Sequence, residues 1–548
     1  MKKITRLGNL TSFVFSQGSR FPSSDSETGD VRFEWAWGAL WLVVGLITRL
    51  WAFGWFRFRE DEALYAYWAR LISSGRDVML EWVPVDKPPL FIYTLAQWFK
   101  WFGVTEAAGR SLSVLASMLS LLLLWLLARR LADARTALWT LALFALSPYA
   151  ISYAHTLYID PTLTMWLVLA LLFASYRLGL LAGLTLGLAF ATKQNGLLFI
   201  PLVVPALLLG RYPLWLQKYL PRFMRCWLLP LITASAGFGY VWFKVWQWDG
   251  WRIHPPEIAN FWEQSWQSYG GLSIAPLAAW PARLTSWWQV WRWWGGWLPG
   301  TALLVGLTII AVCFAAIQGR RTHHFSVKDL WILLFAAYIL GYLLLHLVWS
   351  FQPWDRYLLP LAPLGTFLAA RGIILLLDAA PARSFWRWGM VVVLVAVLAV
   401  GAGKAAAARI PIGGDHGAYS GVDSVADYLR THVPRAHGVV YQRWLGWHWL
   451  WYLWDGPSPV YWADPAMLVA DLSSDPYGYA RFVVFPGWEL DKKEPLEASL
   501  APLGLHLSER LRVIQSGTDH TQFVVYEIEP HAPIVMPWPE CNLLPGSP

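Results

Sequence analysis

The chain has 548 residues, of which 57% are hydrophobic and only 14% are charged, and this balance excludes a soluble globular protein. Its three cysteines, Cys226, Cys313 and Cys541, are too few and too scattered for a disulfide framework or a zinc site. The net charge of +8 does not indicate a nucleic-acid partner, because basic residues in a membrane protein more often record its orientation. The composition therefore predicts a polytopic α-helical membrane protein.

Residues 1–34 are predicted to form a cytoplasmic N-terminal tail rather than a removable signal peptide. The basic residues near the start are followed by a polar, Ser-rich stretch, without a compact apolar segment or a small-residue cleavage site. Residues 35–404 then contain about eleven apolar segments of membrane-spanning length. These segments lie near 35–56, 108–128, 136–152, 161–176, 178–192, 195–210, 226–246, 297–318, 329–349, 356–377 and 387–404. Arg49, inside the first segment, is expected to be a structural residue that reaches the outer interface with its long side chain.

The distribution of basic residues predicts which side of the membrane each loop faces. With the N-terminus inside, every inner loop is basic, as the positive-inside rule requires. An odd number of spans then places residues 405–548 outside, together with the loops at 57–107, 153–160 and 247–296. The 40 tryptophans fit this arrangement, because Trp favours the membrane interface. The alternative role for these tryptophans is stacking on a sugar.

The first outer loop, 57–107, is predicted to contain two helices that lie flat in the outer interface. Apolar residues recur at helical spacing from Leu64 to Ile72, and Gly75 is placed to end that helix. A second helix follows Pro88 and Pro89 and ends at Gly103. Its apolar face is expected to hold Leu90, Phe91, Thr94, Leu95, Trp98 and Phe102. Acidic side chains in this loop would thereby be held at the level of the lipid headgroups.

Residues 405–548 differ in character, with shorter apolar runs and more Gly, Asp and Pro. A helix is predicted over 422–431, and "GVVYQ", "RFVVF" and "FVVYEIEP" are typical of strands. We therefore expect a small extracytoplasmic α/β domain. Its Trp-rich stretch at 443–454 is too short to span the membrane, and either dips into the interface or contacts a substrate.

Five motifs occur in a defined order: an acidic pair after the first span, "VDKPPL", "YIDP", "ATKQNGLLFIP" and "DRYLLPLAPL". In their order and spacing, over most of residues 35–378, the chain resembles the bacterial glycosyltransferase 39 group. That group is related to protein O-mannosyltransferases and lipid A aminoarabinose transferases. The resemblance implies the multispanning GT-C fold and transfer of a sugar from a polyprenyl-phosphate carrier, usually with inversion, on the outer face of the membrane. Residues 405–548 carry no matching motif.

The acidic pair Asp61 and Glu62 is the candidate catalytic pair. A glycosyl transfer needs a base that takes the proton from the acceptor hydroxyl, and a carboxylate can serve. Asp61 resembles the essential aspartate of the family, and Glu62 would orient the acceptor or share a site with it. The alternative is that both carboxylates cap the following helix, where negative charge is favoured.

Asp86 and Lys87 of "VDKPPL" are candidate substrate-binding residues. Lys87 matches a family lysine that would offset charge on the departing phosphate. Asp86 takes the place of a glutamate in the aminoarabinose transferases, so a metal-binding or sugar-contacting role does not carry over directly. The alternative is a surface ion pair ahead of a turn. Whether a divalent metal ion takes part is left open, and no other cofactor is expected.

Four more residues are candidates for binding the donor. Asp160 matches a family aspartate, and its alternative role is the N-cap of the fourth span, ahead of Pro161. Lys193 and Arg356 are cations predicted on the outer side, where a lipid-linked phosphate would lie, and Arg can bind phosphate through two parallel hydrogen bonds. Each could instead snorkel to the interface. Tyr357 is a neighbouring hydrogen-bond donor.

The sequence thus predicts an integral membrane glycosyltransferase with a GT-C transmembrane domain over 35–404 and an α/β domain over 405–548. The predicted partners are a polyprenyl-phosphate sugar donor, a lipid, glycan or protein acceptor, and membrane lipids, with no nucleic acid. A bacterial inner or plasma membrane is the expected location. A transporter or flippase of lipid-linked sugars is the alternative, although such proteins tend to hold ionisable groups near the bilayer midplane. A catalytically inactive glycan receptor is a third hypothesis.

Overall fold

The computed structural model describes residues 27–212, 228–268, 273–351, 354–380, 385–414, 416–433, 438–474, 480–515 and 519–530. The chain divides into two compact units, one made of Met1–Trp55 and Trp68–His416, the other of Phe56–Tyr67 and Gly417–Pro548. Residues 405–416 therefore group with the helical unit, and Phe56–Tyr67 groups with the C-terminal residues. Most of the predicted cytoplasmic tail lies outside the described residues.

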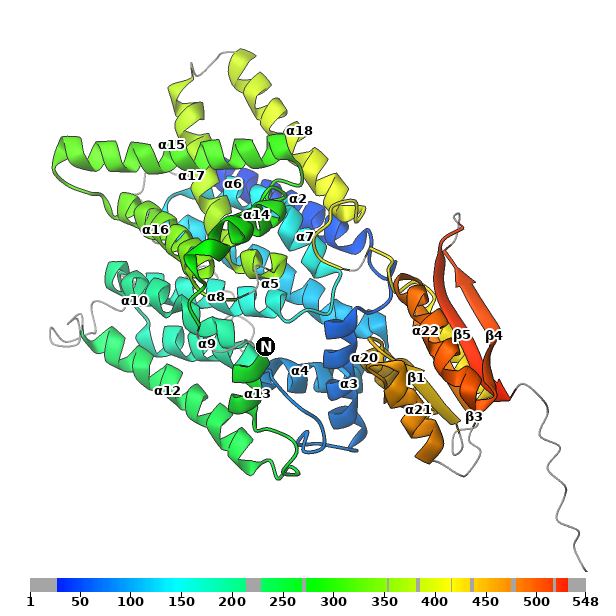
Figure 1. Cartoon of the computed structure of the whole chain (residues 1–548). Helices are drawn as coiled ribbons and strands as arrows, with labels where there is room; N and C mark the ends of the chain where they lie inside the picture. Colours follow the sequence, from blue (N-terminus) through cyan, green and yellow to red (C-terminus); the bar gives the residue numbers. More distant parts are fainter. Residues whose placement is uncertain are drawn as a thin grey trace, which may run out of the picture. The chain divides into compact units, whose positions relative to one another are not determined.

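The first unit is helical (Figure 1). Its elements are α2 (Glu27–Leu50), α4 (Pro89–Phe102), α5 (Glu106–Leu131), α6 (Ala134–Ala145), α7 (Pro148–Ala154), α8 (Asp160–Ser175), α9 (Gly179–Thr192), η1 (Gln194–Phe199), α10 (Ile200–Leu209), α12 (Leu228–Trp251), α13 (Phe261–Ser268), η3 (Leu277–Ala279), α14 (Trp280–Trp291), α15 (Leu298–Thr322), α16 (Val327–Val348), η4 (Asp355–Leu361), α17 (Ala362–Ala379) and α18 (Phe385–Ala406). Helix α3 (Glu60–Ser74) begins in the second unit and ends in the first.

Six helices of the described part are long and apolar enough to cross a membrane: α5, α12, α15, α16, η4 with α17, and α18. The pair α6 and α7, bent by 51°, would make a seventh. Helices α8, α9 and η1 with α10 are apolar but shorter. The predicted first span falls on α2, which ends at Leu50. The polytopic helical architecture is thus confirmed, while the number of eleven spans stays a prediction.

Arg49 does not reach the interface as predicted. Its side chain is fully buried, and its guanidinium donates hydrogen bonds to Ser117 Oγ at 2.8 Å and to the Phe144 carbonyl at 3.1 Å. It also donates to the Gly45 and Ala145 carbonyls. A buried guanidinium needs such acceptors, and packed helices supply them where water is excluded. Arg49 is therefore a structural residue that joins α2, α5 and α6.

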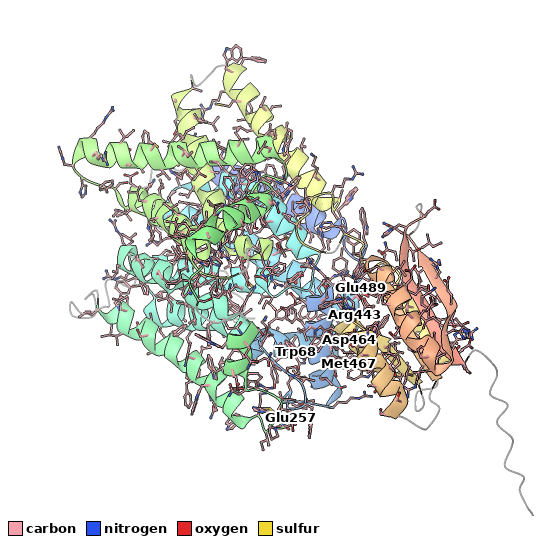
Figure 2. The ribbon with its side chains drawn as sticks, in the orientation of Figure 1. Trp68, Glu257, Arg443, Asp464, Met467 and Glu489 are labelled. Carbon is pink, nitrogen blue, oxygen red and sulfur yellow. The ribbon has the colours of Figure 1, made fainter. Side chains whose placement is uncertain are left out.

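Both helices predicted for the first outer loop are present. Helix α3 is followed by Gly75 at φ 76°, and Trp68 near its middle is buried (Figure 2). Helix α4 begins at Pro89 and is followed by Gly103 at φ 87°, a backbone conformation that glycine adopts without strain. The side of α4 that packs inside the protein overlaps the predicted apolar face only at Phe91 and Leu95, and the placement of that face in the outer interface stays a prediction. The buried side holds Phe91, Ile92, Leu95, Ala96 and Phe99, whereas Thr94 and Phe102 are exposed.

A stripe of glycines lets α9 approach α12 closely. A methyl group on Gly183 would lie 1.9 Å from the Ala234 carbonyl oxygen, and one on Gly179 would lie 2.0 Å from the Pro230 carbonyl oxygen. Small residues at four-residue spacing permit such backbone contact between membrane helices. This close packing fixes α9, and Lys193 follows directly at its C-terminal end.

The second unit contains a five-stranded sheet with the order β2-β1-β3-β5-β4. Its elements are α19 (Val422–His432), β1 (Gly438–Gln442), α20 (Gly446–Tyr452), β2 (Ser458–Tyr461), α21 (Pro465–Ser474), β3 (Ala480–Pro486), η5 (Gly487–Lys492), α22 (Lys493–Leu500), η6 (Ala501–Leu503), β4 (Leu505–Ile514) and β5 (Thr521–Pro530). Strand β1 runs parallel to β2 and β3, and β5 runs antiparallel to β3 and β4. The predicted helix and the three predicted strands are all present.

Apolar side chains of the sheet point alternately to two cores. One core joins α19 and α20 to Val440, Phe482 and Val525, and the other joins α21 and α22 to Tyr441 and Val524. The unit is therefore an α/β sandwich with helices on both faces of the sheet. Within the Trp-rich stretch at 443–454, Trp449 lies in the first core, whereas Trp444 is exposed.

Candidate functional site

A buried ion pair joins two parts of the helical unit that are distant in the sequence. Lys193 Nζ lies 2.7 Å from Asp160 Oδ1, and the two side chains are only 2% and 1% exposed. The other carboxylate oxygen of Asp160 is also buried, and it has no hydrogen-bond partner within the described ranges. Because removing such a pair from water costs free energy, this arrangement is more typical of a functional site than of a stabilising contact.

Asp160 does not cap the fourth predicted span. The residue at the N-cap position of α8 is Ile159, in helical conformation, and no side chain caps it. Asp160 is instead the first residue of the helix, and Pro161 follows it. Proline is tolerated in the first turn because a backbone N–H there would have no acceptor within the helix. The capping alternative for Asp160 is therefore wrong, since its carboxylate pairs with Lys193.

Two further predicted cations, Lys87 and Arg356, lie near this pair. Lys193, which lies between α9 and η1 and outside both, has its Nζ 4.9 Å from the centroid of the Tyr357 ring. Burial lowers the pKa of Lys193 from its usual value to about 8; Asp160 opposes this shift, and the charges of Arg356 and Lys87 lower the pKa further. Like charges brought together in a buried place favour binding of an anion.

Arg356 is oriented by aromatic rings and by its neighbour in the chain. Its guanidinium carbon lies 5.3 Å from the centroid of the Tyr158 ring and 5.6 Å from that of Trp354. The Asp355 carboxylate accepts hydrogen bonds from the backbone N–H of Arg356 and of Gly413, both at 2.9 Å. These contacts hold the start of η4 and present the guanidinium in a defined direction.

Asp86 and Lys87 form an ion pair in the loop that precedes α4. Lys87 is only 9% exposed, so the pair exists but does not lie on the surface as the alternative supposed. Gln194 donates from its side-chain amide to the Asp86 carbonyl and to Ser265 Oγ, the latter at 2.8 Å. Ser265 Oγ donates to the same carbonyl at 3.0 Å. Gln194 therefore ties the Lys87 loop to the segment that carries Lys193.

Neither Gln194 nor Ser265 was singled out by the sequence. Gln194 directly follows Lys193 inside the motif "ATKQNGLLFIP". This position in the motif was the one sequence feature that could have indicated Gln194 as a site residue. Ser265 lies on α13, in a stretch without a motif. Its hydrogen bond to the Asp86 carbonyl forms only because the loop before α4 packs against that helix, so no sequence signal indicated it.

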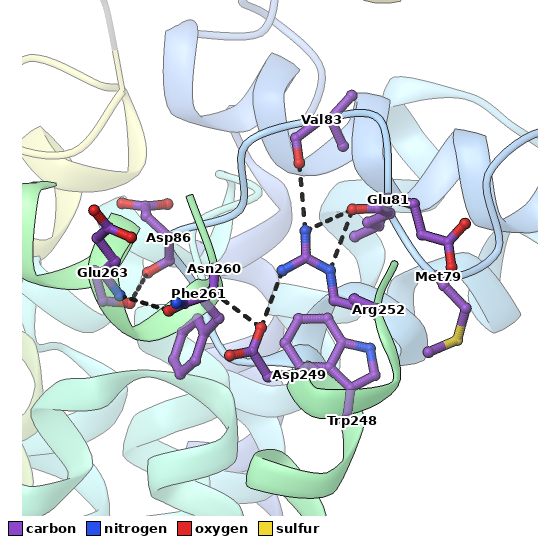
Figure 3. Close-up of polar contacts among 12 residues, drawn as sticks. Met79, Glu81, Val83, Asp86, Trp248, Asp249, Arg252, Asn260, Phe261 and Glu263 are labelled. Atoms are coloured by element: carbon purple, nitrogen blue, oxygen red, sulfur yellow. Dashed lines mark hydrogen bonds and ion pairs between the residues drawn. The ribbon is translucent and has the colours of Figure 1, made fainter. Parts of the chain in front are cut away.

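Arg252, directly after α12, fixes the path of the loop that leads to Lys87 (Figure 3). Its guanidinium donates to the Leu80 carbonyl at 2.6 Å and 3.2 Å and to the Val83 carbonyl at 3.4 Å. It also lies 3.3 Å from Asp249 Oδ1, which accepts a hydrogen bond from the Phe261 backbone N–H at 3.0 Å. One fully buried side chain thus holds the loop, α12 and α13 together.

Arg252→Lys is expected to loosen the loop over 77–88 and to leave α5 unchanged. Lysine keeps a positive charge near Asp249, but it cannot reproduce the planar fork that reaches the Leu80 and Val83 carbonyls. Amide hydrogen exchange followed by mass spectrometry should show faster exchange in this loop. Lys244→Met, at an exposed position on α12, is the control. Unchanged exchange in the loop would show that Arg252 does not hold it.

The predicted catalytic pair lies in the first turn of α3, in the second unit. The Glu62 carboxylate is buried and accepts a hydrogen bond from the Arg59 backbone N–H at 2.9 Å, so the capping alternative is confirmed for Glu62. Asp61 is half-buried. Glu60, which the sequence did not single out, accepts a hydrogen bond from the Tyr419 hydroxyl. This turn favours carboxylates because it exposes backbone N–H groups.

His448 fixes the start of α3 to the C-terminal residues. Its ring is fully buried, and Nε2 donates to the Phe58 carbonyl at 3.0 Å, since a carbonyl can only accept. Burial lowers the pKa of His448 to about 4, although the nearby charges of Glu60 and Glu62 oppose the shift. The imidazole is therefore neutral at neutral pH. The acidic turn is held by the α/β unit and is not part of a slack outer loop.

The structure thus sorts the predicted site residues into two sets. The helical unit brings together Asp160, Lys193, Arg356 and Tyr357 and connects them through Gln194 to Asp86 and Lys87, whereas Asp61 and Glu62 belong to the α/β unit. Among the described residues, no three His, Cys, Asp or Glu side chains are grouped so that they could hold a metal ion.

Comparison with known proteins finds similarity over part of the chain. Residues 86–237 match the family model described as dolichyl-phosphate-mannose-protein mannosyltransferase. Over 179 residues the chain is 30% identical to the undecaprenyl phosphate-α-4-amino-4-deoxy-L-arabinose arabinosyl transferase of Pseudomonas aeruginosa (strain UCBPP-PA14). The corresponding enzyme of Pseudomonas paraeruginosa (strain DSM 24068 / PA7) is equally similar. Each match covers 29% of this chain and 31% of the relative, so the chain spans less than a third of either protein's length.

Solved structures share the fold over most of the chain. ArnT from Cupriavidus metallidurans in the apo state has a TM-score of 0.57 at 17% identity, covering 92% of this chain and 98% of that one. The same protein bound to undecaprenyl phosphate has a TM-score of 0.54 at 18% identity, covering 91% and 98%. The Archaeoglobus fulgidus oligosaccharyltransferase tethered with an acceptor peptide has a TM-score of 0.55 at 11% identity, covering 90% and 74%. The resemblance to membrane glycosyltransferases of the GT-C fold is confirmed.

Proposed function

We propose that this integral membrane protein is a glycosyltransferase that moves a sugar from a polyprenyl-phosphate-linked donor to an acceptor on the outer face of the membrane. The observation that carries the proposal is the gathering of Lys87, Lys193 and Arg356 around the buried Asp160. A cation cluster beside apolar helices suits a phosphate whose attached lipid occupies the membrane. The proposal is further supported by the match over 86–237, which begins at Asp86.

The chemistry assigned to this cluster is stabilisation of the leaving phosphate. As the bond between the anomeric carbon and the phosphate oxygen breaks, its electron pair stays with the phosphate, which gains negative charge. Lys87, Lys193 and Arg356 offset this charge, and Tyr357 lies beside Lys193 as a further donor. The polyprenyl phosphate then leaves as the second product.

Asp61 is the proposed base. The acceptor hydroxyl oxygen attacks the anomeric carbon, and the Asp61 carboxylate takes the hydroxyl proton as the new glycosidic bond forms. A single displacement of this kind inverts the anomeric configuration. The donor sugar, a hexose or a pentose, is not distinguished by these residues, and the acceptor is a lipid, a glycan or a protein.

The residues present do not fit a resident divalent metal ion. Asp86, which replaces the glutamate of the aminoarabinose transferases, is paired with Lys87, and Asp160 is paired with Lys193. Carboxylates that are neutralised by lysine are poor ligands for a hard cation, which needs several oxygen ligands. We therefore derive no step through a metal.

The proposal is tested with purified protein in lipid vesicles supplied with radiolabelled polyprenyl-phosphate sugars and cell-envelope glycolipids as acceptors. We expect release of polyprenyl phosphate together with label on a new product, whose anomeric configuration is read by NMR. If the label crosses the vesicle membrane while still attached to its carrier, and no product forms, the protein is a transporter and the proposal is wrong.

Glu62→Gln is expected to leave transfer close to that of the wild type. A glutamine oxygen can accept the same hydrogen bond from the Arg59 backbone N–H, so the cap is kept while the charge is lost. Glu62→Ala should instead lower stability by about 1 kcal/mol through loss of the cap. Initial transfer rates and thermal unfolding in detergent measure the two effects. A large drop in transfer with Glu62→Gln would give Glu62 a catalytic role.

A further inference from the structure

The sheet of the second unit has a topology that creates a binding edge. The chain leaves β1 through α20 to reach β2 on one side, and then passes through α21 to reach β3 on the other side of β1. These two helices belong to cores on opposite faces of the sheet. The strand order therefore reverses between β1 and β3. In open α/β sheets, ligands bind at such a point, outside the carboxyl ends of the parallel strands.

Polar side chains follow each of the three parallel strands at this edge. Arg443 follows β1, Asp464 comes shortly after β2, and Glu489 comes shortly after β3, and all three are labelled in Figure 2. Arg443 Nε lies 3.2 Å from Glu489 Oε1, and Arg443 also donates to the Ala463 carbonyl. Its guanidinium carbon lies 5.2 Å from the centroid of the Trp462 ring. The guanidinium is thus fixed between the ends of three strands.

Glu489 has an unused acceptor. The residue is only 7% exposed, and its Oε2 atom has no hydrogen-bond partner among the residues that the structure covers. A buried polar atom without a partner costs about 1–3 kcal/mol, and more when the group is charged. The Asp464 carboxylate, in contrast, already accepts a hydrogen bond from the Met467 backbone N–H at 2.9 Å. A ligand that donates a hydrogen bond to Glu489 Oε2 would remove this cost.

Exposed indole rings adjoin the polar groups. Trp444, next to Arg443, is 58% exposed, and Trp488, next to Glu489, is 47% exposed. Large exposed aromatic side chains beside fixed polar groups indicate a binding surface. A pyranose offers one apolar C–H face for an indole and hydroxyl groups for a carboxylate and a guanidinium. The paired opposite charges disfavour a strongly anionic or cationic ligand, and no Gly-rich loop follows β1 to hold a phosphate.

We propose that the carboxyl edge of β1 and β3 binds a neutral saccharide, through Arg443, Glu489, Trp444 and Trp488, and that this saccharide belongs to the acceptor. The acceptor assignment, but not the binding itself, rests on the proposed function. The edge is connected to the acidic turn within the same unit. The rings of Trp488 and Tyr419 meet edge to face with centroids 5.5 Å apart, and the Tyr419 hydroxyl donates to Glu60, the neighbour of Asp61.

Binding is measured on the full chain in lipid nanodiscs, without any donor, using short neutral manno-, gluco- and galacto-oligosaccharides as probes. Saturation-transfer NMR detects the bound sugar, and titration gives its Kd. Glu489→Gln, which is nearly isosteric, and Trp488→Ala should each raise Kd about tenfold or more, equivalent to about 1.4 kcal/mol. The matched controls are Glu494→Gln and Leu503→Ala, at exposed positions of the same unit, which should bind as the wild type does.

The outcomes separate this inference from the proposed function. Binding that is weakened by Glu489→Gln and Trp488→Ala, but not by the controls, supports the saccharide site even if no transfer is found. Absence of binding by the wild type, or equal binding by Glu489→Gln, overturns it even if transfer proceeds. If binding is lost while the KM for the acceptor in the transfer reaction is unchanged, the assignment of this saccharide to the acceptor is wrong.

Discussion

Asp61→Asn is expected to lower sugar transfer by about a hundred- to ten-thousand-fold, the range that a positioned general base contributes. Asparagine has nearly the same size and is also favoured near helix N-termini, so the first turn of α3 should form as before. What it loses is the ability to take the proton of the acceptor hydroxyl. Initial rates at saturating donor and acceptor, together with thermal unfolding in detergent, measure the effect on catalysis and on stability separately.

The control for this variant is Asp427→Asn, which removes an exposed carboxylate from α19 in the same unit. It should transfer sugar as the wild type does. If Asp61→Asn keeps the wild-type rate while Glu60→Gln loses it, the base is Glu60, which the Tyr419 hydroxyl contacts, and the assignment to Asp61 is wrong.

Lys193→Met is the second change with a large expected effect. Removing the ammonium leaves the Asp160 carboxylate buried without its partner, and breaking a buried ion pair in this way costs about 3–5 kcal/mol. We therefore expect a strongly lowered unfolding temperature and the loss of transfer. Thermal unfolding in detergent measures the first, and transfer from the radiolabelled donor measures the second.

The double variant Asp160→Asn/Lys193→Met separates a structural role from phosphate binding. Without the unpaired charge, most of the lost stability should return, because replacing both partners of a buried pair costs far less than removing one. If Lys193 also stabilises the leaving phosphate, the folded double variant should still transfer sugar poorly. Recovery of both stability and wild-type transfer would make the pair purely structural.

Helices and strands were predicted well where the residue pattern within a single segment determines the secondary structure. Helices α3 and α4 follow from apolar residues at helical spacing and from Gly75 and Gly103, whose positive φ ends each helix. Strands β1, β3 and β5 follow from short runs of β-branched and aromatic residues. Which side of α4 packs inside the protein did not follow from the sequence, because a helix with apolar residues around most of its surface does not reveal which side another helix covers.

Contacts between distant segments followed less directly. The sequence predicted Lys193 and Arg356 at the same depth on the outer side, and motif resemblance added Lys87. How close the three cations come depends on how the segments pack. Gln194 and Arg252 join loops to helices through backbone carbonyls, and backbone carbonyls carry no sequence signal. Glu60 was passed over because its partner Tyr419 lies in a distant part of the chain.

The sequence by itself determined that this is a polytopic membrane protein, that acidic residues follow its first apolar segment, and that an α/β unit lies at its C-terminal end. Composition, periodicity and turn residues are properties of contiguous chain, so they can be read without coordinates. Only the tertiary structure decided that Phe56–Tyr67 belongs to the α/β unit, that Glu62 is a cap, that Asp160 pairs with Lys193, and that Arg443 and Glu489 meet at one edge of a sheet. Each of these features depends on which groups come into contact when the chain folds. For residues that are distant in the sequence, the packing of helices and strands decides which groups meet.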